Sequence, residues 1–363
     1  MRIRHNGPFV RICPVAALIL TAVLSLAGCG ANSGTGSASD PGIGSDSSGS
    51  SGSDRLSDTT ASGQENADAG YEAPSSPRTD GAVVFQDSLG RQVTVTDPER
   101  TAAMIGSFAD IWCLAGGKDS LVAAAHDTWT YFDLGLDDSV IDIGNTKEPN
   151  LELLAAADPD FVIASSNTDA DVRILDTLES MGMNVAYFQV SNFEEYLHML
   201  DICTQITGER QRYHQYGELL REQIDRSKDA ADGSSPTVLY VRASGSSCKI
   251  KNSRGSVLGE MLRDLGCVNI ADSETSLLED LNMEAILAAD PQYIFVVLQG
   301  ADKEAVTETL EKNLLSHPAW QNLTAVQEGR YHILDDRLYN LKPNALWGQA
   351  YEDLARLLYP DSF

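Results

Sequence analysis

The stretch NLELLAAADPDFVIA at residues 150–164 returns as NMEAILAADPQYIFV at residues 282–296, and this repeated unit decides the predicted fold. Each copy opens with Asn, a preferred helix cap, and continues with Ala-rich sequence that suits a helix. An Asp-Pro pair then ends the helix. The apolar run that follows shows no alternation, which is typical of a strand covered on both faces. Each copy therefore predicts a capped short helix, a sharp turn and a buried strand.

The spacing of the two copies predicts two similar halves. They lie about 130 residues apart, roughly one domain length, which indicates an α/β fold of two lobes, each with a central sheet. Between them, Glu209 to Ala230 is predicted to form one uninterrupted helix about 33 Å long, a rigid spine between the lobes. We expect a first lobe at 81–207, a bridging helix at 208–232 and a second lobe at 233–363.

The start of the chain has the features of an export signal. Three arginines precede the apolar run Val15–Leu26, which is too short for a comfortable membrane span and leads into Ala27-Gly28-Cys29. This order resembles a bacterial lipoprotein signal peptide over residues 1–28, cut before Cys29, which would carry the lipid. An ordinary secretory signal with a chance cysteine is the alternative.

The next segment predicts a tether. Residues 30–80 are rich in Ser, Gly and Asp, so we expect a disordered chain that spans on the order of 40 Å from the lipidated Cys29. The predicted location is extracytoplasmic and lipid-anchored to the cell membrane, on the outer face of a Gram-positive cell or in a Gram-negative periplasm.

Charge and cysteines exclude several classes of protein. The net charge is −27, and it becomes −30 without the three arginines of the signal peptide. Such acidity argues against binding nucleic acid and against lying flat on anionic lipid. Cys113 and Cys203 lie among apolar residues and are predicted core thiols. Whether Cys248 and Cys267 pair stays open, and no CxxC spacing marks a zinc site.

Enzyme motifs are missing from the sequence. It contains no Gly-rich phosphate loop, no G-x-S-x-G and no HExxH, so we expect no enzyme and no catalytic residue. Asp110, Asp127 and Glu148 would be candidates for an acid pair, but nothing fixes their separation. The six histidines do not indicate a converging set of metal ligands, so we predict neither a resident metal nor a cofactor.

An ordered set of motifs carries a resemblance to a known family. Beside the signal peptide and the two repeats, the motifs are Asp87-x-x-Gly90-Arg91-x-Val93-x-Val95, Pro98-Glu99-Arg100, a helix after Thr207-Gly208, and Trp320-x-x-Leu323-x-Ala325-Val326-x-x-Gly329-Arg330-Tyr331. Together they cover about residues 83–358. They resemble the helical-backbone class of substrate-binding proteins of ABC importers, which serve ferric siderophores, haem, vitamin B12 and some bare metals.

The resemblance implies how such a protein works. It implies a ligand cleft between the lobes, little hinge motion, no catalysis, and delivery to an ABC permease dimer with its ATPase by a protein that we expect to be a monomer. The sequence departs from the family in one respect. It shows no obvious cluster of several arginines like those that grip highly anionic siderophores in some members.

The ligand-binding residues are predicted from a rule about α/β folds, in which ligands meet the loops at the carboxyl ends of parallel strands. The rule selects residues 107–110, 126–132, 145–148, 165–168, 242–245, 251–254, 273–276, 299–300 and 339–342. From these loops, the predicted ligand-binding residues are His126, Trp129, Tyr131, Lys147, Ser166, Arg242, Arg254, Tyr339 and Lys342.

Each kind of candidate has a physical reason and an alternative. Aromatic rings stack on flat chelates, and a cation such as Arg242 at a buried strand end needs an anionic partner. Trp129 would otherwise simply cap its lobe, and Lys249, Lys251 and Arg254 would otherwise form a solvated face. A further hypothesis makes His126 and Tyr131 axial ligands of a haem iron.

The repeated glutamates, Glu152 and Glu284, are the last candidates. An acid in the first turn of a helix is stabilised by the helix dipole, which would explain both residues without any function. The resemblance implies instead that each docks on an arginine pocket of the permease. The predicted function is capture of an iron chelate, most of all a ferric siderophore, for import. Cobalamin or another corrinoid, then haem, are the alternative ligands; a surface sensor or adhesion lipoprotein and an enzyme are less favoured.

Overall fold

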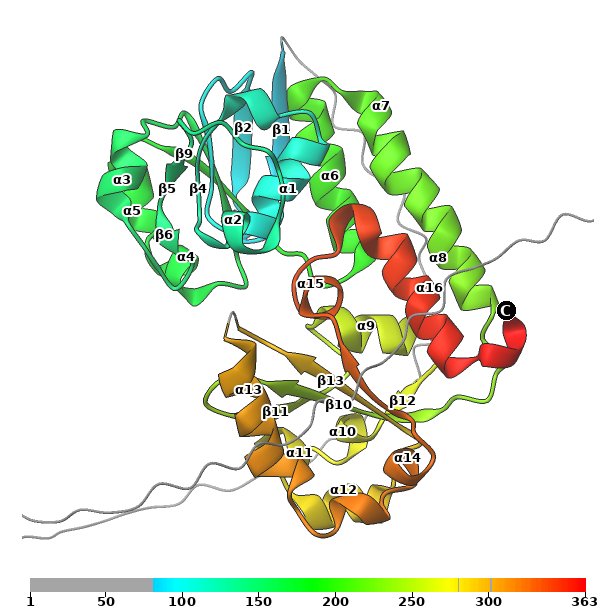
Figure 1. Cartoon of the computed structure of the whole chain (residues 1–363). Helices are drawn as coiled ribbons and strands as arrows, with labels where there is room; N and C mark the ends of the chain where they lie inside the picture. Colours follow the sequence, from blue (N-terminus) through cyan, green and yellow to red (C-terminus); the bar gives the residue numbers. More distant parts are fainter. Residues whose placement is uncertain (1–80, 280, 301) are drawn as a thin grey trace, which may run out of the picture. The chain divides into compact units, whose positions relative to one another are not determined.

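The structure is a computed structural model that describes residues 81–279, 281–300 and 302–363 (Figure 1). The predicted signal peptide, the lipidated Cys29 and the tether lie outside the described residues. Within the described part of the chain, no helix is long and apolar enough to cross a membrane.

The first lobe is built on a five-stranded sheet with the strand order β5-β4-β3-β8-β9, in which every pair is parallel. Its strands are β3 (Thr101–Ala103), β4 (Leu121–Ala124), β5 (Ile141–Asp142), β8 (Phe161–Ser165) and β9 (Asn184–Phe188). Its helices are α1 (Gly106–Leu114), α2 (Asp127–Tyr131), α3 (Leu151–Ala156), α4 (Asp169–Arg173), α5 (Leu175–Ser180) and α6 (Phe193–Thr207). Two antiparallel pairs accompany the sheet: β1 (Ala82–Gln86) with β2 (Gln92–Thr96), and β6 (Gly144–Asn145) with β7 (Glu148–Pro149).

The second lobe has a sheet with the order β11-β10-β13-β14, and β12 pairs with the start of β10. Its strands are β10 (Thr237–Ala243), β11 (Cys248–Lys251), β12 (Val268–Asn269), β13 (Tyr293–Leu298) and β14 (Tyr331–Leu334). Only β11 is antiparallel to its neighbour. Its helices are α9 (Val257–Asp264), α10 (Ile270–Ser273), α11 (Ser276–Glu279), α12 (Met283–Ala289), α13 (Lys303–Leu310), α14 (Thr324–Gln327), α15 (Asp336–Tyr339) and α16 (Trp347–Leu358). The predicted fold class, two α/β lobes with central sheets, is confirmed.

The repeated unit has the structure that its sequence predicts. The side chains of Asn150 and Asn282 cap α3 and α12 by accepting hydrogen bonds from backbone N–H groups two and three residues on. Asp158 and Asp290, before the two prolines, adopt positive φ angles of 46° and 39°. Asp tolerates this left-handed conformation better than most residues, and it turns the chain sharply into the following strand. Both strands are buried and flanked by neighbours on either side.

The connection between the lobes differs from its prediction in one respect. It consists of α7 (Arg210–Tyr213), a π-helical segment (His214–Glu218) and α8 (Leu219–Asp229), so the predicted uninterrupted α-helix is wrong in its middle. The π-helical segment contains Gly217, where an added Cβ would lie 2.9 Å from Leu197 Cδ2 of α6. The local change of register thus accompanies a close approach of the connection to α6.

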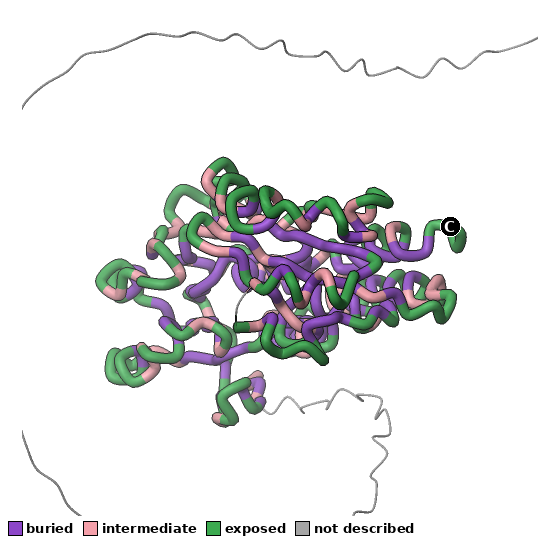
Figure 2. The backbone as a smooth tube through the Cα atoms, turned by 90° about the horizontal axis from the view of Figure 1, so that it is seen from below, coloured by how far each residue is buried: buried purple, intermediate pink, exposed green. Residues whose placement is uncertain are grey.

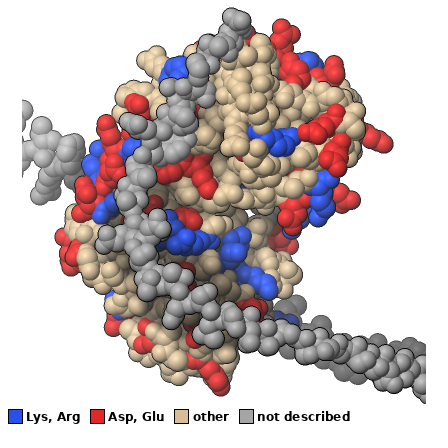
Figure 3. All heavy atoms as spheres, turned by 180° about the vertical axis from the view of Figure 1, so that it is seen from behind, with Lys and Arg blue, Asp and Glu red and all other residues tan. Residues whose placement is uncertain are grey.

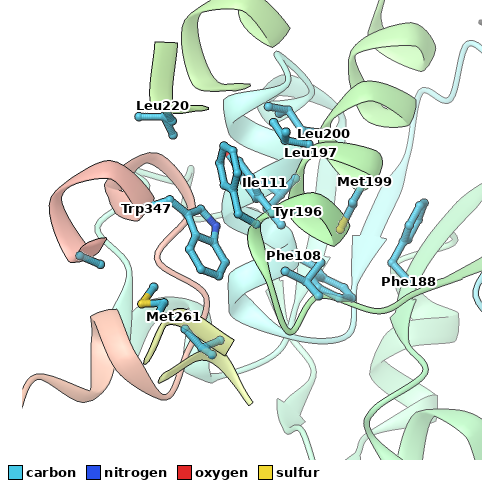
Figure 4. Close-up of a cluster of buried hydrophobic side chains, with 14 of the residues drawn as sticks. Phe108, Ile111, Phe188, Tyr196, Leu197, Met199, Leu200, Leu220, Met261 and Trp347 are labelled. Carbon is cyan, nitrogen blue, oxygen red and sulfur yellow. The ribbon is translucent and has the colours of Figure 1, made fainter. Parts of the chain in front are cut away.

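The largest hydrophobic core runs through both lobes. Trp347 of α16 packs on Phe193 and Tyr196 of α6, with ring centres 5.9 and 6.2 Å apart (Figure 4). α16 also packs along α8 (Figure 1), and Figure 2 shows buried residues in the interior with exposed residues mostly around them. The lobes are therefore joined by packing as well as by the connecting helix.

The cysteines of the described part are all free thiols. Cys203 is fully buried, as predicted for a core thiol, and Cys113 is partly buried. Cys248 and Cys267 do not pair, because they belong to different hydrophobic cores: Cys267 packs in the large core, and Cys248 in the core on the other face of the second sheet.

Candidate ligand-binding site

Two adjoining cavities lie between the lobes. The smaller has a volume of about 490 Å³ and the larger about 1010 Å³. They share the lining residues Asp127, Thr146, Gln299, Asn340 and Leu341, so they form one continuous cleft. A further cavity, between β1 and α6, belongs to the first lobe alone and contains none of the predicted ligand-binding residues.

The first-lobe wall of the cleft follows from the topology of its sheet. Its polar lining comes from the segments that follow the carboxyl ends of parallel strands, where the lobes of such folds bind ligands. Beside the apolar Ile105 and Val190, the lining side chains in the smaller cavity carry hydroxyl, amide or carboxylate groups: Ser107, Asp127, Thr146, Asn167, Thr168 and Ser191. This wall therefore offers mainly neutral hydrogen-bonding groups, with one carboxylate.

The strand-end rule fails for two predicted loops, and the first is residues 251–254, which follow the antiparallel strand β11 and line neither cavity. Residues 273–276 follow β12, but they line neither cavity. The reason is the register of β12, whose Val268 and Asn269 pair with Thr237 and Val238 at the start of β10. A two-residue strand paired there ends far short of the carboxyl end of β10, so its loop lies at the opposite edge of the sheet.

The second-lobe wall is basic, because Arg242 and Lys342 line the smaller cavity. Lys249 and Lys251 line neither cavity but lie beside Arg242 in the sheet. In the antiparallel register, Arg242 of β10 faces Lys249 of β11, and Tyr240 faces Lys251. Side chains two apart share a face of a sheet, so these four residues lie on one face. The alternate residues Leu239, Val241, Cys248 and Ile250 pack into the core behind them. Figure 3 shows Lys and Arg side chains gathered along a hollow in the surface.

The positive charges of this wall lie close enough together to disfavour one another. Burial lowers the pKa of Lys251, and the charge of Arg242 acts in the same direction. Burial also lowers the pKa of Lys342; Arg242 adds to this effect, while Asp127 and Glu195 oppose it. The Nε–H of Arg242 is buried and donates to no described residue. Within the same residues, none of these three cations forms an ion pair.

Asp127 is the carboxylate that faces this basic wall. Its Oδ1 accepts a hydrogen bond of 2.9 Å from the backbone N–H of Gly106. Burial raises its pKa to about 6, although Gly106, Lys342 and His126 act in the opposite direction. Gly106 permits this approach, since an added Cβ would lie 2.6 Å from the backbone N of Thr128. The carboxyl of Asp127 therefore changes its charge in a mildly acidic range.

Asp127 belongs to a segment that the sequence predicts as a loop. Residues 127–131 instead form the short helix α2, so that prediction is wrong. Asp127 itself was selected only as part of its range and as a candidate for an acid pair. A carboxylate among the polar and aromatic residues that follow a buried strand was the available signal.

Six of the nine predicted ligand-binding residues line the cleft. His126, Tyr131 and Lys147 line the larger cavity, and Arg242, Tyr339 and Lys342 line the smaller one. Tyr339 offers only its ring, because its hydroxyl donates to the carbonyl oxygen of Ala350 at 3.1 Å. The ammonium of Lys342 lies 5.9 Å from the ring centre of Phe108, so it reaches across to the first lobe.

The other three lie outside the two cavities. Trp129 is 41% exposed and lines a separate surface pocket formed by its own loop. Ser166 donates its hydroxyl to the carbonyl oxygen of Phe188 at 3.3 Å, which stabilises its own lobe. Arg254 is exposed, although its neighbours Gly255 and Ser256 line the smaller cavity. These three residues therefore do not line the cleft.

The pair of residues considered for haem lies at the larger cavity. His126 Nδ1 is 2.6 Å from Asp142 Oδ2. Burial raises the pKa of the Tyr131 phenol, and the nearby charges of Asp336 and Asp127 add to this effect. Across the residues that the structure describes, no group of three or more His, Cys, Asp or Glu side chains is gathered to hold a metal ion.

The two repeated glutamates occupy equivalent places on the surface. Glu152 and Glu284 are exposed, each in the first turn of a short helix directly after its Asn cap. Neither side chain forms a hydrogen bond or an ion pair with another described residue. Both carboxylates are thus available to a partner.

Two α/β lobes joined by a helical connection, with a polar cleft between them, are typical of a binding protein. Residues 102–338 match the model of the periplasmic binding protein family, so the chain belongs to that family. The family is one of binding proteins rather than of enzymes, and its members are extracytoplasmic.

Individual relatives are distant. The chain is 25% identical over 199 residues to the iron-uptake system-binding protein of Bacillus subtilis, which covers 52% of the chain and 59% of that protein's length. It is 22% identical over 264 residues to the Fe(3+)-citrate-binding protein of the same organism, which covers 69% of the chain and 78% of the relative. Among solved structures, the periplasmic haem-binding protein of Roseiflexus sp. RS-1 in apo form matches with a TM-score of 0.59 and 21% identity, over 73% of this chain and 99% of that one.

Proposed function

We propose that the protein is the substrate-binding lipoprotein of an ABC importer and that it captures an anionic iron chelate of the ferric siderophore class. The names of the two curated relatives support iron as the cargo. The observation that carries the proposal is the basic wall of the cleft, where Arg242 and Lys342 line the smaller cavity and Lys251 lies on the same face of the sheet as Arg242.

These cations favour an anionic ligand for a physical reason. Each is partly removed from water, and Arg242 disfavours the charged forms of both lysines. An anion in the cleft replaces the lost hydration and relieves the mutual repulsion of the three cations. A neutral or cationic ligand leaves both costs in place.

The basic wall also accounts for the missing arginine cluster. Its charges come from three segments: β10, β11 and the loop at residues 339–342. Two of them are lysines, which bind as point charges rather than as the planar forks that arginines present to carboxylates. The opposite wall supplies hydroxyl and amide groups for the polar periphery of a chelate.

Haem is a second candidate, favoured by His126. The contact of its Nδ1 with Asp142 orients the ring and leaves Nε2 for a metal, an arrangement that is common around iron and zinc. Tyr131 weakens this candidate as the other axial ligand, because its raised pKa disfavours the phenolate form. A corrinoid is the remaining alternative ligand.

Delivery of the ligand depends on one exposed glutamate of each lobe and on the lipid. We infer that Glu152 and Glu284 dock on arginines of the permease dimer, whose ATPase drives import. Their exposure and their equivalent positions after Asn150 and Asn282 support this role. Cys29 carries the lipid that keeps the protein at the membrane.

A ligand panel tests the proposal. The purified full chain is titrated with ferric citrate, catecholate and hydroxamate ferric siderophores, haem and aquocobalamin, with thermal shift and tryptophan quenching as readouts. We expect a stabilising shift with at least one anionic ferric chelate. Binding of haem or cobalamin alone assigns the protein to the alternative ligand, and binding of none of these compounds overturns the proposed function.

A further inference from the structure

Arg337 joins the two lobes beside the cleft without lining it. It lies near the start of α15 in the second lobe, and its side chain is 21% exposed. Its Nη2 is 3.1 Å from Asp110 Oδ2 in α1 of the first lobe. Its guanidinium carbon lies 4.1 Å from the ring centre of Phe132, the residue that follows α2. Its Nη1 donates to the carbonyl oxygen of Lys342 at 2.6 Å.

Asp110 receives a second contact from the same part of the second lobe. Asn344 Nδ2 donates to Asp110 Oδ2 at 2.8 Å and to the carbonyl oxygen of Ser107 at 2.9 Å. Asn344 is fully buried. Burial raises the pKa of Asp110, while Asn344 and Arg337 act against that rise. A charge this far removed from water is stable only while its partners stay in place.

Arg337 and Asn344 lie on either side, in the sequence, of the loop that lines the cleft. Residues 339–342 contribute to the smaller cavity, and they lie between Arg337 and Asn344. On the other side, α1 carries Ser107, and α2 carries Asp127, both of which line the same cavity. One guanidinium therefore contacts elements that supply lining residues to both walls.

We propose that Arg337 is a positioning residue, which holds the loop at 339–342 against α1 and α2 and so sets the distance between the two walls of the cleft. This inference rests on the proposed function for its effect on affinity. Its effect on the unliganded protein does not depend on the identity of the ligand.

The experiment uses the full chain with two variants and a matched control. Arg337→Met removes the guanidinium and leaves Asp110 without its cation. The double variant Arg337→Met with Asp110→Asn avoids an unpaired buried charge, which keeps the test valid if the single variant folds poorly. Arg91→Met is the control. Arg91 is similarly buried, pairs with Asp87, donates to Val185 and stacks on Tyr187, all within the first lobe.

Two readouts separate positioning from plain stability. Hydrogen exchange of the unliganded protein reports protection of residues 106–114 and 335–347, and quenching titrations with ferric citrate report affinity. We expect the Arg337 variants to exchange at least about tenfold faster in both segments, and to bind ferric citrate about tenfold more weakly. Arg91→Met is expected to change neither segment nor the affinity.

Several results would overturn the inference. Faster exchange in only one of the two segments means that Arg337 does not couple the lobes. Unchanged affinity in folded Arg337 variants of a protein that binds ferric citrate means that the cleft keeps its geometry without it. If the parent protein binds no ferric chelate, the proposed function fails, while the exchange measurement still decides whether Arg337 anchors the lobes.

Discussion

Arg242 is the residue on which the proposed ligand chemistry depends most directly. Its buried Nε–H donates to no residue that the structure describes, and its charge disfavours the charged forms of Lys251 and Lys342. We predict that Arg242→Met weakens binding of an anionic ferric chelate by at least about 30-fold, because truncating a buried charge partner costs about 2 kcal/mol or more. Quenching titrations measure the loss.

Arg254 provides the matched control for that prediction. It is exposed and lines neither cavity, although the sequence predicts it as a ligand-binding residue. Exposed charges contribute little to affinity, so Arg254→Met should stay within about threefold of the parent protein. A larger loss in Arg254→Met than in Arg242→Met would contradict the arrangement of the cleft described above.

Asp127 is the residue from which we expect a pH dependence of ligand affinity. Its carboxyl has a pKa of about 6 and faces Lys342, with His126, Tyr131 and Asp171 as further charged or titratable neighbours. Above that pH it is ionised and repels an anionic ligand. We therefore predict that affinity falls by about tenfold between pH 5.5 and 7.5, and that binding takes up a proton at neutral pH.

Calorimetry in buffers of different ionisation enthalpy counts that proton. Asp127→Asn should abolish the uptake and flatten the pH dependence, which separates the protein from any titration of the chelate itself. An identical pH profile in the variant would show that Asp127 does not face the ligand. The sign for stability follows the same logic: the folded state holds the extra proton between about pH 3.8 and 6, so this group's contribution to stability falls as the pH rises through that window.

At the scale of elements, the approach of α1 to α2 positions Asp127. Gly106 begins α1, and a Cβ there would lie 2.6 Å from the N and 2.8 Å from the Cα of Thr128. These are backbone atoms, which cannot move aside as a side chain can. We predict that Gly106→Ala lowers the free energy of unfolding by about 2–3 kcal/mol and weakens ligand binding, as measured by denaturant unfolding and titration.

Gly245→Ala is the control at this scale. Its added Cβ would meet nothing within 4 Å, so we expect a change of less than about 0.5 kcal/mol in stability. Equal effects of the two substitutions would mean that the contact between α1 and α2 relaxes at no cost.

The elements were largely predictable because their signals are local. The Asn caps, the Asp-Pro turns and the unbroken apolar runs of the repeat specify α3, β8, α12 and β13 within fifteen residues each. The π-helical segment at residues 214–218 was not predictable, since it depends on how closely Gly217 approaches α6. The helix α2 was also missed; it packs against α1, where the backbone N–H of Gly106 donates to Asp127 Oδ1.

The sequence predicted most of the chain segments that line the site, but it predicted the individual lining residues less well. Strand ends placed Arg242 and Lys342 near the cleft, but the same rule also selected Trp129, Ser166 and Arg254, which face elsewhere. The position of Lys251 beside Arg242 depends on the antiparallel pairing of β11 with β10, which the sequence analysis does not predict. Arg337 was missed entirely, because its partner Asp110 lies 227 residues away in the sequence.

At the scale of the whole molecule, the two lobes are held together in three ways. The helical connection joins them covalently, the core around Trp347 packs across them, and Arg337 and Asn344 hydrogen-bond from one to the other. Because the lobes are held together, surface groups on the two lobes keep a constant separation. A partner can therefore bind both lobes at once, and each lobe contributes most to the affinity for that partner when the other lobe is already bound.

Glu152 and Glu284 are the groups that such a partner would recognise. We predict that Glu152→Ala with Glu284→Ala leaves ligand affinity unchanged and abolishes uptake of the chelate in cells. The reason is that these exposed charges orient the permease and do not line the cleft. Each single variant should reduce uptake only partly. Glu222→Ala, an exposed glutamate on α8, should leave uptake intact. Weaker ligand binding in the double variant would place these glutamates in the cleft, and normal uptake would remove them from docking.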